Sequence, residues 1–336
     1  MEESCLKNLF NQQIGEAIQS MEQLPLAGSN RQYYRIKSKH HTLIGVIGTS
    51  IEENNAFIYM AQHFEKTELP TPKLIAQSSD KQCYLQEDLG NTSLFDLITQ
   101  RTDAGSLSSE SIRLLHQTMQ ELSRFQFEGA KNFDFSQCYP QPTFNKRTIL
   151  WDLNYFKYCF LKSTSIEFQE DLLEDDFEKF ADILLRPTET AFMYRDFQSR
   201  NVMIVDGKPK FIDFQGGRKG PIYYDLASFL WQAKAKLSNQ DRSLFIESYI
   251  EALQPYVTIS RDVFNKNLTY FVLFRTLQVL GAYGYRGYFE RKEHFIQSIP
   301  YAINNLKGLL KQDFTDFPYI SQLLQKITEL KKYQTQ

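Results

Sequence analysis

Asp196, Asn201 and Asp213 have the side-chain types, in the order along the chain, that phosphoryl transfer requires. This chemistry needs little covalent help from a protein, but it needs an acceptor hydroxyl held in line and Mg²⁺ to neutralise the phosphate oxygens. Asp196 can accept the hydroxyl proton, and the amide and carboxylate oxygens of Asn201 and Asp213 are the hard ligands that Mg²⁺ prefers. The three residues therefore predict a site for magnesium-dependent phosphoryl transfer.

A predicted β-hairpin brings these residues together. Residues 201–205 and 210–212 are strand-like, and they flank Asp206-Gly207-Lys208-Pro209, a strong turn sequence. Asn201 begins the first strand and Asp213 follows the second, so the hairpin returns both side chains to the same end. Turn-forming residues at strand ends would explain either pair alone, but the complete arrangement favours a functional site.

The rest of the chain divides into a strand-rich front and a helix-rich remainder. Residues 6–21 have the apolar spacing of a helix, and strand patterns follow at 32–36, 41–47 and 82–86, with a helix at 52–64 between the last two. After Gly90, long helical patterns dominate, at residues 111–125, 148–162, 167–185, 241–253 and 263–279. A small mixed lobe followed by a larger helical lobe is expected, and nucleotides favour the clefts of such proteins.

Composition excludes several classes of protein. The 336 residues allow about two domains, and 42% hydrophobic with 23% charged residues is ordinary for a globular chain. The 38 Lys and Arg against 40 Asp and Glu give a net charge of −2, which offers no large basic surface for nucleic acid or anionic lipid. We therefore expect neither nucleic acid nor a membrane as a partner, and partner proteins are not predicted.

The cysteines and the apolar segments bear on the cellular location of the protein. Cys5, Cys83, Cys138 and Cys159 form no CxxC pair and are irregularly spaced, so neither a disulfide framework nor a zinc site is expected, and reduced thiols are typical of the cytosol. The first 20 residues lack the apolar core of a signal peptide. Residues 268–285 are interrupted by Arg275 and fall short of the roughly 20 apolar residues of a membrane span. A soluble, cytoplasmic protein is expected.

Around the hairpin, the sequence resembles the aminoglycoside phosphotransferase and choline kinase superfamily. The resemblance extends over residues 24–310 and is most specific at 194–233. Within the superfamily, three stretches look most like the sugar kinases that phosphorylate N-acetylmuramate and N-acetylglucosamine at the anomeric hydroxyl. They are Gly28-Ser29-Asn30-Arg31-Gln32-Tyr33-Tyr34-Arg35, Arg195-Asp196-Phe197-Gln198-Ser199-Arg200-Asn201, and Asp213-Phe214-Gln215 with Gly220-Pro221-Ile222-Tyr223-Tyr224-Asp225-Leu226-Ala227-Ser228.

The resemblance implies an α+β, bilobal, protein-kinase-like fold. A small antiparallel-sheet lobe for nucleotide binding would span residues 1–88 and end in the hinge. A mainly helical lobe would span residues 89–336, with a catalytic loop at 194–201, a metal loop at 212–217 and the acceptor site. ATP and Mg²⁺ are the implied cofactors, Asp196 the implied base, and Asn201 and Asp213 the implied metal ligands. Asp225 resembles a structural aspartate after the metal loop, with a plain helix cap as the alternative.

The phosphate-binding residues depart from the kinase pattern. Gly28, Ser29 and Asn30 lie between two predicted strands, where backbone amides bind phosphate oxygens in kinase-like proteins, but neither G-x-G-x-x-G nor G-x-x-x-x-G-K-[ST] occurs. Residues 41–47 contain no lysine for the phosphates. Arg31 or Arg35 is the candidate replacement, with both as solvated edge residues the alternative. Glu53 would orient such a cation, unless it belongs to a solvated helix face.

Two further regions, the catalytic loop and the hinge, are compared with the superfamily pattern. Tyr194 stands where the superfamily usually has a histidine before the catalytic loop, and it is expected to support that loop. The hinge is expected at residues 86–90, where adenine is usually bound by backbone groups; Gln86 and Asp88 are the nominated positions. A side-chain carboxylate facing a ribose hydroxyl is the alternative at the hinge.

The acceptor site is the least defined part. Asp152 and Tyr155 would lie on one helix face, where an aromatic ring beside polar groups suits a sugar, although an aromatic core helix is the commoner case. Arg275 in an apolar helix needs a partner, either a substrate anion or, more commonly, a buried carboxylate. Gln198 and Arg200 belong to the catalytic loop and are candidates to contact the acceptor or the transferred phosphate.

These observations predict an ATP- and Mg²⁺-dependent small-molecule kinase whose acceptor is a sugar or amino sugar. An aminoglycoside or choline-type kinase is the first alternative, with the acidic residues 170–176 as an aminoglycoside-binding candidate or a solvated helix face. A nucleotide-binding scaffold that has lost catalysis is the alternative from another class, and the missing strand lysine and Tyr194 favour it. The retained Asp196, Asn201 and Asp213 argue against it.

Overall fold

The computed structural model describes residues 2–25 and 31–333, and it divides into two compact units. Unit 1 comprises residues 1–142 and 194–218, and unit 2 comprises residues 143–193 and 219–336. The Asp–Asn–Asp residues of the hairpin region all belong to unit 1. The assignment of residues 1–88 and 89–336 to separate functional lobes stays a prediction.

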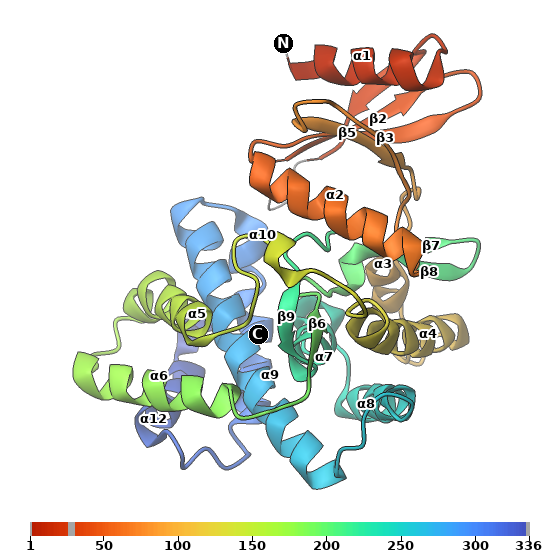
Figure 1. The fold of residues 1–336 in the computed structure, drawn as a ribbon. Helices are drawn as coiled ribbons and strands as arrows, with labels where there is room; N and C mark the ends of the chain where they lie inside the picture. Colours follow the sequence, from red (N-terminus) through yellow and green to blue (C-terminus); the bar gives the residue numbers. More distant parts are fainter. Residues whose placement is uncertain (1, 26–30, 334–336) are drawn as a thin grey trace. The chain divides into compact units, whose positions relative to one another are not determined.

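A five-stranded antiparallel sheet forms the N-terminal part of unit 1 (Figure 1). Its strands lie in the order β1-β2-β3-β5-β4. They are β1 (Ser20–Gln23), β2 (Gln32–Lys37), β3 (Thr42–Ile47), β4 (Leu74–Gln77) and β5 (Cys83–Glu87). Helices α1 (Glu2–Ile14) and α2 (Ile51–Lys66) lie on opposite sides of the sheet in Figure 1.

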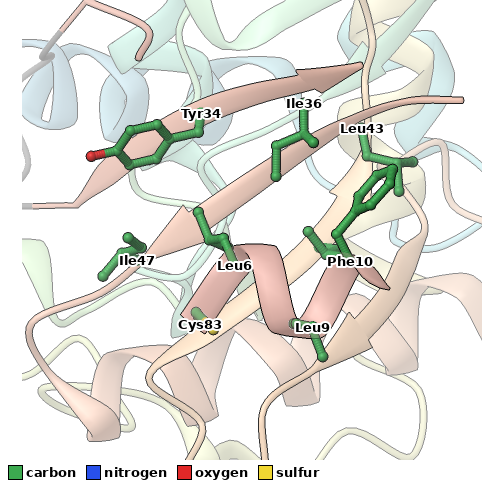
Figure 2. Close-up of a cluster of buried hydrophobic side chains, with 9 residues drawn as sticks. Leu6, Leu9, Phe10, Tyr34, Ile36, Leu43, Ile47 and Cys83 are labelled. Atoms are coloured by element: carbon green, nitrogen blue, oxygen red, sulfur yellow. The ribbon is translucent and has the colours of Figure 1, made fainter. Parts of the chain in front are cut away.

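The two faces of the sheet carry different side chains because successive residues of a strand point in opposite directions. Tyr34 and Ile36 of β2 and Leu85 of β5 join Leu6 and Phe10 of α1 in one buried cluster (Figure 2). On the other face, Tyr84 of β5 stacks on Phe57 of α2 with the ring centroids 4.6 Å apart. The apolar spacing of α2, with Ala56, Phe57, Met60, Ala61 and Phe64 all buried, produces this contact.

The start of the chain differs from the sequence prediction of a helix over residues 6–21. Helix α1 ends at Ile14, because Gly15 adopts a left-handed φ of 71° and its N–H donates to the Asn11 carbonyl oxygen. Such a glycine ends helices without the penalty that a side chain would bring. Strand β1 follows at Ser20, and β4 was likewise not predicted, because four-residue strands carry too few residues for a clear alternating pattern.

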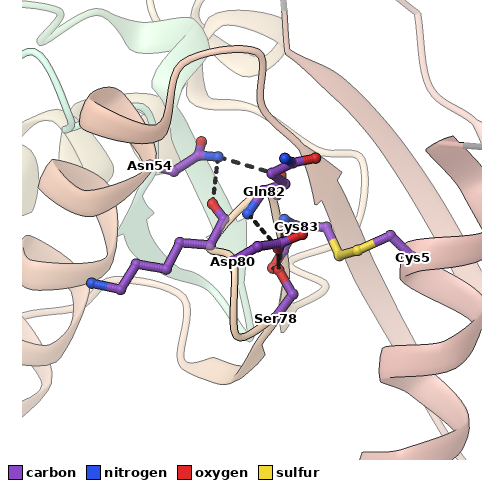
Figure 3. The surroundings of a disulfide bond; sticks show 7 residues. Cys5, Asn54, Ser78, Asp80, Gln82 and Cys83 are labelled. Carbon is purple, nitrogen blue, oxygen red and sulfur yellow. Dashed lines mark hydrogen bonds between the residues drawn. A yellow bond between two sulfur atoms is a disulfide. The ribbon is translucent and has the colours of Figure 1, made fainter.

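A disulfide between Cys5 and Cys83 contradicts the expectation that the thiols are reduced (Figure 3). Cys5 lies in α1 and Cys83 begins β5, 78 residues later, with the two Cα atoms 6.6 Å apart. The packing of α1 on the sheet brings them together, and no local spacing could have indicated it. Cys138 and Cys159 are free.

The remainder of unit 1 includes the predicted hairpin. Strands β7 (Val202–Val205) and β8 (Lys208–Phe211) pair in a register that leaves Asp206 and Gly207 as a two-residue loop. Both loop residues have positive φ, 49° and 69°, as a type I′ turn requires. Helices α3 (Leu94–Thr99) and α4 (Ser109–Phe127) and the 3₁₀ turns η1 (Phe135–Gln137) and η3 (Ser199–Asn201) complete the unit.

Unit 2 is mainly helical, as the sequence predicted. Its helices are α5 (Lys146–Cys159), α6 (Glu170–Leu184), α7 (Tyr223–Leu230), α8 (Asn239–Leu253), α9 (Arg261–Gly284), α10 (Glu293–Ile296), α11 (Ile299–Leu309) and α12 (Pro318–Glu329). Its shorter elements are η2 (Leu161–Thr164), β6 (Thr190–Met193), β9 (Arg218–Pro221, beginning at the last residue of unit 1), η4 (Ala233–Ala235), the π-helical η5 (Tyr285–Phe289) and η6 (Lys331–Tyr333). None of the helices in the described ranges is long and apolar enough to cross a membrane.

Glycines allow α5 and α9 to pack closely. A Cβ added at Gly281 would lie 2.8 Å from the Phe156 nitrogen, and one at Gly284 would lie 2.1 Å from the Cys159 carbonyl oxygen. Both glycines are therefore needed for the close packing of the two helices. The pairing of position 281 with 156 and of 284 with 159 also shows that the two helices run in the same direction.

We predict that Gly281→Ala destabilises the protein by about 1–3 kcal/mol, because the added methyl group meets the backbone of α5 and cannot be accommodated by a side-chain rotation. Gly308→Ala in α11 is the matched control, since nothing lies within 4 Å of the added Cβ. The control should stabilise by about 0.5–1 kcal/mol through helix propensity. Urea unfolding measures both, and equal effects of the two substitutions would contradict the packing argument.

Candidate active site

The side-chain amide of Asn201 connects the three predicted residues. Its Nδ2 donates to the Asp196 backbone oxygen at 2.8 Å and to Asp213 Oδ2 at 3.2 Å. Asn201 ends η3, directly before β7, and its carbonyl oxygen accepts from the Ile212 N–H, which follows β8. The hairpin therefore returns the metal loop to the catalytic loop, as the sequence predicted.

Residues with left-handed backbone conformations set the chain direction in both the catalytic loop and the metal loop. Arg195 has a φ of 74° and Asp213 a φ of 69°. Such values are uncommon for residues with a Cβ and persist where the surrounding contacts fix them, often at functional loops. They lie directly before Asp196 and at Asp213 itself, so the strain is located at the two carboxylates.

Tyr194 holds the catalytic loop against the metal loop. The buried hydroxyl group donates to the Ile212 carbonyl oxygen at 2.7 Å. The ring packs edge-on against Phe125 and Phe197, with centroids 5.5 and 5.4 Å away. A tyrosine at this position thus fixes the loop through the residue before Asp213.

The two carboxylates of the site lie close to one another. Burial and the negative charge of Asp196 raise the pKa of Asp213, against the opposing effects of the Gln215 hydrogen bond and the charges of Arg200 and Arg31. Gln215 Nε2 donates to Asp213 Oδ1 at 2.8 Å. The negative charge collected here favours a cation, and the oxygen donors of Asn201 and Asp213 fit a hard divalent ion.

An arginine–glutamate pair lies on the same side of the sheet as α2. Arg31 is 2% exposed, its Nη2 lies 3.4 Å from Glu53 Oε1, and it donates to the Glu53 backbone oxygen at 3.2 Å. Its guanidinium lies over the Phe57 ring at 5.8 Å, and its charge lowers the pKa of Asp213. The pair has the composition of a cation oriented by a helix carboxylate, as the strand lysine and helix glutamate have in protein kinases.

Arg35 is instead bound at the hinge. It donates to both carboxylate oxygens of Asp88, at 2.6 and 3.0 Å, and to Asn91 Oδ1 and the Gly90 carbonyl oxygen. Asp88 Oδ1 also accepts from the Gly90 N–H. Of the two candidate cations, Arg35 is therefore engaged at the hinge, and Arg31 stays the candidate for phosphate. The Asp88 carboxylate is already bound by Arg35 and the Gly90 N–H rather than open to a ribose.

The other nominated residues of unit 1 have less distinctive surroundings. Gly28, Ser29 and Asn30 lie outside the described residues. Gln86 is buried in β5 and Gln198 is half-buried. Arg200 is exposed, and its charge lowers the pKa of Asp213. Their proposed contacts with nucleotide or acceptor stay predictions.

The remaining nominated residues belong to unit 2. Asp152 and Tyr155 lie in α5, and burial raises the pKa of Tyr155 to about 12. Asp225 is fully buried in the first turn of α7. Arg275 of α9 is 6% exposed, and its guanidinium lies over the Tyr224 ring at 5.4 Å. The carboxylate partner that we regarded as the commoner case for Arg275 is absent from residues 2–25 and 31–333.

Sequence reasoning missed three contributors to the site. Gln215 fixes Asp213, and Phe214 stacks on Phe57 with the centroids 5.0 Å apart, which joins the metal loop to α2. The signal for Gln215 was its position two residues after Asp213. The signal for Phe57 was the apolar periodicity of α2, which indicates a buried face but not what the face contacts.

A small antiparallel sheet, a helical remainder and an Asp–Asn–Asp set around a hairpin define a kinase-like phosphotransferase. The structure is similar to choline kinase LicA from Streptococcus pneumoniae, with a TM-score of 0.63 at 13% identity over 92% of this chain and 99% of that one. It is equally similar to a putative aminoglycoside phosphotransferase from Ralstonia eutropha JMP134, with a TM-score of 0.63 at 12% identity over 93% and 99% of the two chains. The predicted kinase-like α+β fold is confirmed.

The chain belongs to the Phosphotransferase enzyme family, whose sequence profile matches residues 20–261. It is 25% identical over 250 residues to the N-acetylmuramate/N-acetylglucosamine kinase of Neisseria meningitidis serogroup B, across 72% of this chain and 71% of that protein. The kinase of the same name from Pseudomonas aeruginosa is 22% identical over 231 residues, across 67% and 64%. The predicted resemblance is confirmed, and the protein is a small-molecule kinase.

We predict a pH dependence of stability from Asp213, measured without metal or nucleotide. Its pKa in the folded protein lies above the ordinary 3.8, so the folded state keeps a proton that the unfolded state has already released. Wild-type protein should therefore lose stability relative to Asp213→Asn as the pH rises from about 3.8 through the raised value. Urea unfolding of both proteins across this range measures the difference.

Asp80→Asn is the control with the opposite direction. Hydrogen bonds from Ser78 Oγ and the Gln82 N–H lower the pKa of Asp80. Wild type should therefore gain stability relative to this variant as the pH rises toward 3.8, by a small amount because Asp80 is exposed. The same pH slope for both variants would refute the assignment.

Proposed function

We propose that this protein transfers the γ-phosphoryl group of ATP, in the presence of Mg²⁺, to a hydroxyl group of a sugar or amino sugar. The observation that carries the proposal is the Asn201 amide, which bonds the catalytic loop at Asp196 and the metal loop at Asp213 together. The names of the two bacterial relatives support a sugar acceptor.

Asp196 is the proposed general base. Its carboxylate is half-buried, and a Cβ at Gly216 would lie 3.5 Å from its Oδ2, so the glycine leaves room beside the carboxylate. Asp196 would orient the acceptor hydroxyl and take its proton as the new phosphorus–oxygen bond forms. The proton transfer and the orientation together typically contribute about 10²–10⁴-fold to the rate.

Asn201 and Asp213 are the proposed metal ligands. Mg²⁺, when bound, neutralises charge on the phosphate oxygens during transfer. The part of the chain that the structure describes holds no cluster of three or more His, Cys, Asp or Glu able to bind a metal ion. In kinases, Mg²⁺ is usually coordinated by a few protein oxygens together with phosphate oxygens and water.

Arg31, oriented by Glu53, is the proposed phosphate-binding cation. A guanidinium can bind two phosphate oxygens at once, which an ammonium group cannot do in a fixed geometry. Backbone amides of residues 28–30 are the proposed loop contacts to phosphate, and backbone groups of Gln86 and Asp88 the proposed contacts to adenine. In this assignment Arg35 orders the hinge rather than the phosphates.

The acceptor is proposed to contact α5 and α9 of unit 2, through Asp152, Tyr155 and Arg275, and Gln198 or Arg200 of the catalytic loop. The cytoplasm is the proposed compartment because ATP is supplied there. The Cys5–Cys83 disulfide removes reduced thiols as an argument for this location.

We predict that Asp196→Asn lowers kcat by about 10²–10⁴-fold while the KM for ATP stays nearly unchanged, because the substitution removes the base and keeps the shape. Release of ADP, with N-acetylmuramate, N-acetylglucosamine, kanamycin and choline as acceptors, measures both constants and identifies the acceptor class. Full turnover of Asp196→Asn would refute its role. ATP binding by the wild type with no transfer to any acceptor of the panel would oppose the proposed activity.

We also predict that Arg31→Met raises the KM for ATP and lowers kcat, with a combined loss in kcat/KM of about 30-fold or more, because a buried charge contact to phosphate is lost. Lys39→Met is the matched control, since Lys39 is exposed in the turn between β2 and β3. Arg31→Lys should recover part of the loss. A larger effect of Lys39→Met would assign the cation to Lys39 instead.

A further inference from the structure

The Cys5–Cys83 disulfide joins helix α1 to strand β5 within unit 1 (Figure 3). Leu6, Leu9 and Phe10 are the side chains that α1 buries against the sheet in the described part of the chain. An isolated helix of 13 residues is marginal in water. The helical state of α1 therefore depends on its attachment to the sheet, through these three side chains and the disulfide.

Helix α1 supplies packing that the central strand of the sheet lacks. A Cβ added at Gly45 of β3 would lie 2.9 Å from both methyl carbons of Leu6, so the Leu6 side chain occupies the space above this glycine. Gly45 pairs with Tyr34 of β2 and with Leu85 of β5. Departure of α1 would leave this space open at the middle of the sheet, with loss of the contacts that now fill it.

Cys83 belongs to a strand whose other face supports the metal loop. Successive residues of a strand point to opposite faces, so Cys83 faces α1 and Tyr84 faces α2. The Tyr84 ring stacks on Phe57 at 4.6 Å, and Phe57 stacks on Phe214 at 5.0 Å. Phe214 directly follows Asp213 in the sequence. The disulfide is thus connected to the proposed metal ligand through strand β5 and a stack of three rings.

The two cysteines of the bond differ in exposure. Cys5 is half-buried, whereas Cys83 is fully buried. Thiol–disulfide exchange requires access to one of the two sulfur atoms, and Cys5 provides it. In the cytoplasm, the compartment proposed above, disulfides are usually transient and redox-sensing because the thiol pool reduces them. The exposure of Cys5 and this compartment both favour a reversible bond over a permanent one.

We propose that Cys5 and Cys83 form a reversible redox switch. The disulfide holds α1 on the sheet, and its reduction by a small thiol releases α1 and loosens the Tyr84–Phe57–Phe214 stack. Nucleotide binding is then tighter in the oxidised protein than in the reduced protein. The inference goes beyond the proposed function, and the release of α1 can be measured without nucleotide.

The chemistry consists of two successive thiol–disulfide exchanges with glutathione. One glutathione thiolate attacks the Cys5 sulfur, forms a mixed disulfide and expels Cys83 as a thiolate, which takes up a proton. A second glutathione thiolate attacks the glutathione sulfur of the mixed disulfide and expels Cys5 as a thiolate, which is also protonated. The two glutathione thiols are oxidised to glutathione disulfide, and the two cysteines are reduced. Excess glutathione disulfide reverses both steps.

The first experiment tests whether the folded protein exchanges the bond. The full chain is incubated with millimolar glutathione and quenched with acid, and its thiols are counted in denaturant. The count should rise from two, Cys138 and Cys159, to four, and it should return to two with excess glutathione disulfide. A bond that resists glutathione until the protein unfolds would refute the switch and indicate a permanent cross-link.

Hydrogen exchange measured by mass spectrometry reports the release of α1. The amides of α1 should exchange about 10-fold or more faster after reduction, because the bond keeps an opened helix beside the sheet and favours its return. Helix α4 of the same unit is the internal reference and should not change. Equal exchange rates of α1 in the oxidised and reduced proteins would overturn the inference.

Two serine variants assign the effect to this pair of cysteines. Cys5→Ser should show the fast exchange of α1 both with and without glutathione, since it cannot form the bond. Cys159→Ser is the matched control and should keep the wild-type response, because Cys159 is a free thiol in the oxidised protein. A response to glutathione that persists in Cys5→Ser would exclude this disulfide as its origin.

Calorimetric titration of ATP with Mg²⁺ tests the effect on nucleotide binding. Reduction of the wild type should raise the Kd about 5-fold or more, the lower end of typical coupling between two sites. Cys5→Ser should have the Kd of the reduced wild type in both conditions. Equal Kd values in the two redox states, with α1 released, would disprove the coupling to the nucleotide. Absence of ATP binding in both states would contradict the proposed function, and the exchange rates of α1 would still decide whether the switch exists.

Discussion

The Asn201 amide is the contact on which the catalytic half of unit 1 depends. Through one NH₂ group it sets the distance between the backbone at Asp196 and the carboxylate of Asp213. Those two acidic residues repel each other, and their loops include residues with left-handed backbone conformations. Three contacts fix the loops and offset the cost of this repulsion and strain. They are the β7–β8 hairpin, the Tyr194 hydroxyl and the Phe57–Phe214 stack. A protein with no use for a cation at this point would gain stability by separating the acids, and this cost is accounted for by the metal site that we propose.

The position of Arg31, the proposed phosphate-binding cation, follows from the sheet. Strand β3 carries apolar side chains on both faces and leads to Gly48, where a Cβ would lie 2.1 Å from Asn54 Oδ1. Asn54 is fully buried and donates to the Lys81 and Gln82 carbonyl oxygens, so this end of the strand has no room for a long side chain. Arg31, directly before β2, reaches Glu53 of α2 from the neighbouring strand. The charge pair is thus obtained from the residue that precedes the neighbouring strand β2, and the absence of a lysine in β3 does not by itself indicate a loss of catalysis.

The sequence predicted the parts of the structure that local patterns determine. The β7–β8 hairpin depends on Asp206 and Gly207, and the long helices depend on apolar periodicity, so both could be located without coordinates. The Cys5–Cys83 disulfide could not, since it forms only after α1 packs on the sheet. Arg31 and Arg35 could not be distinguished in sequence either, because one directly precedes β2, the other lies within it, and only the position of Asp88 assigns Arg35 to the hinge. The sequence could indicate which residues have the side chains needed for catalysis. Which of two arginines pairs with which carboxylate depends on the tertiary structure.

Unit 2 shows the same compromise between stability and function at a second place. Its helices pack tightly at Gly281 and Gly284, yet Arg275 is buried against Tyr224 with no carboxylate partner in the described part of the chain. Exchange for an apolar residue would remove that cost. Proteins carry such costs chiefly where a ligand later supplies the missing partner, because the binding energy is then larger for an anion held in a desolvated site than at the surface.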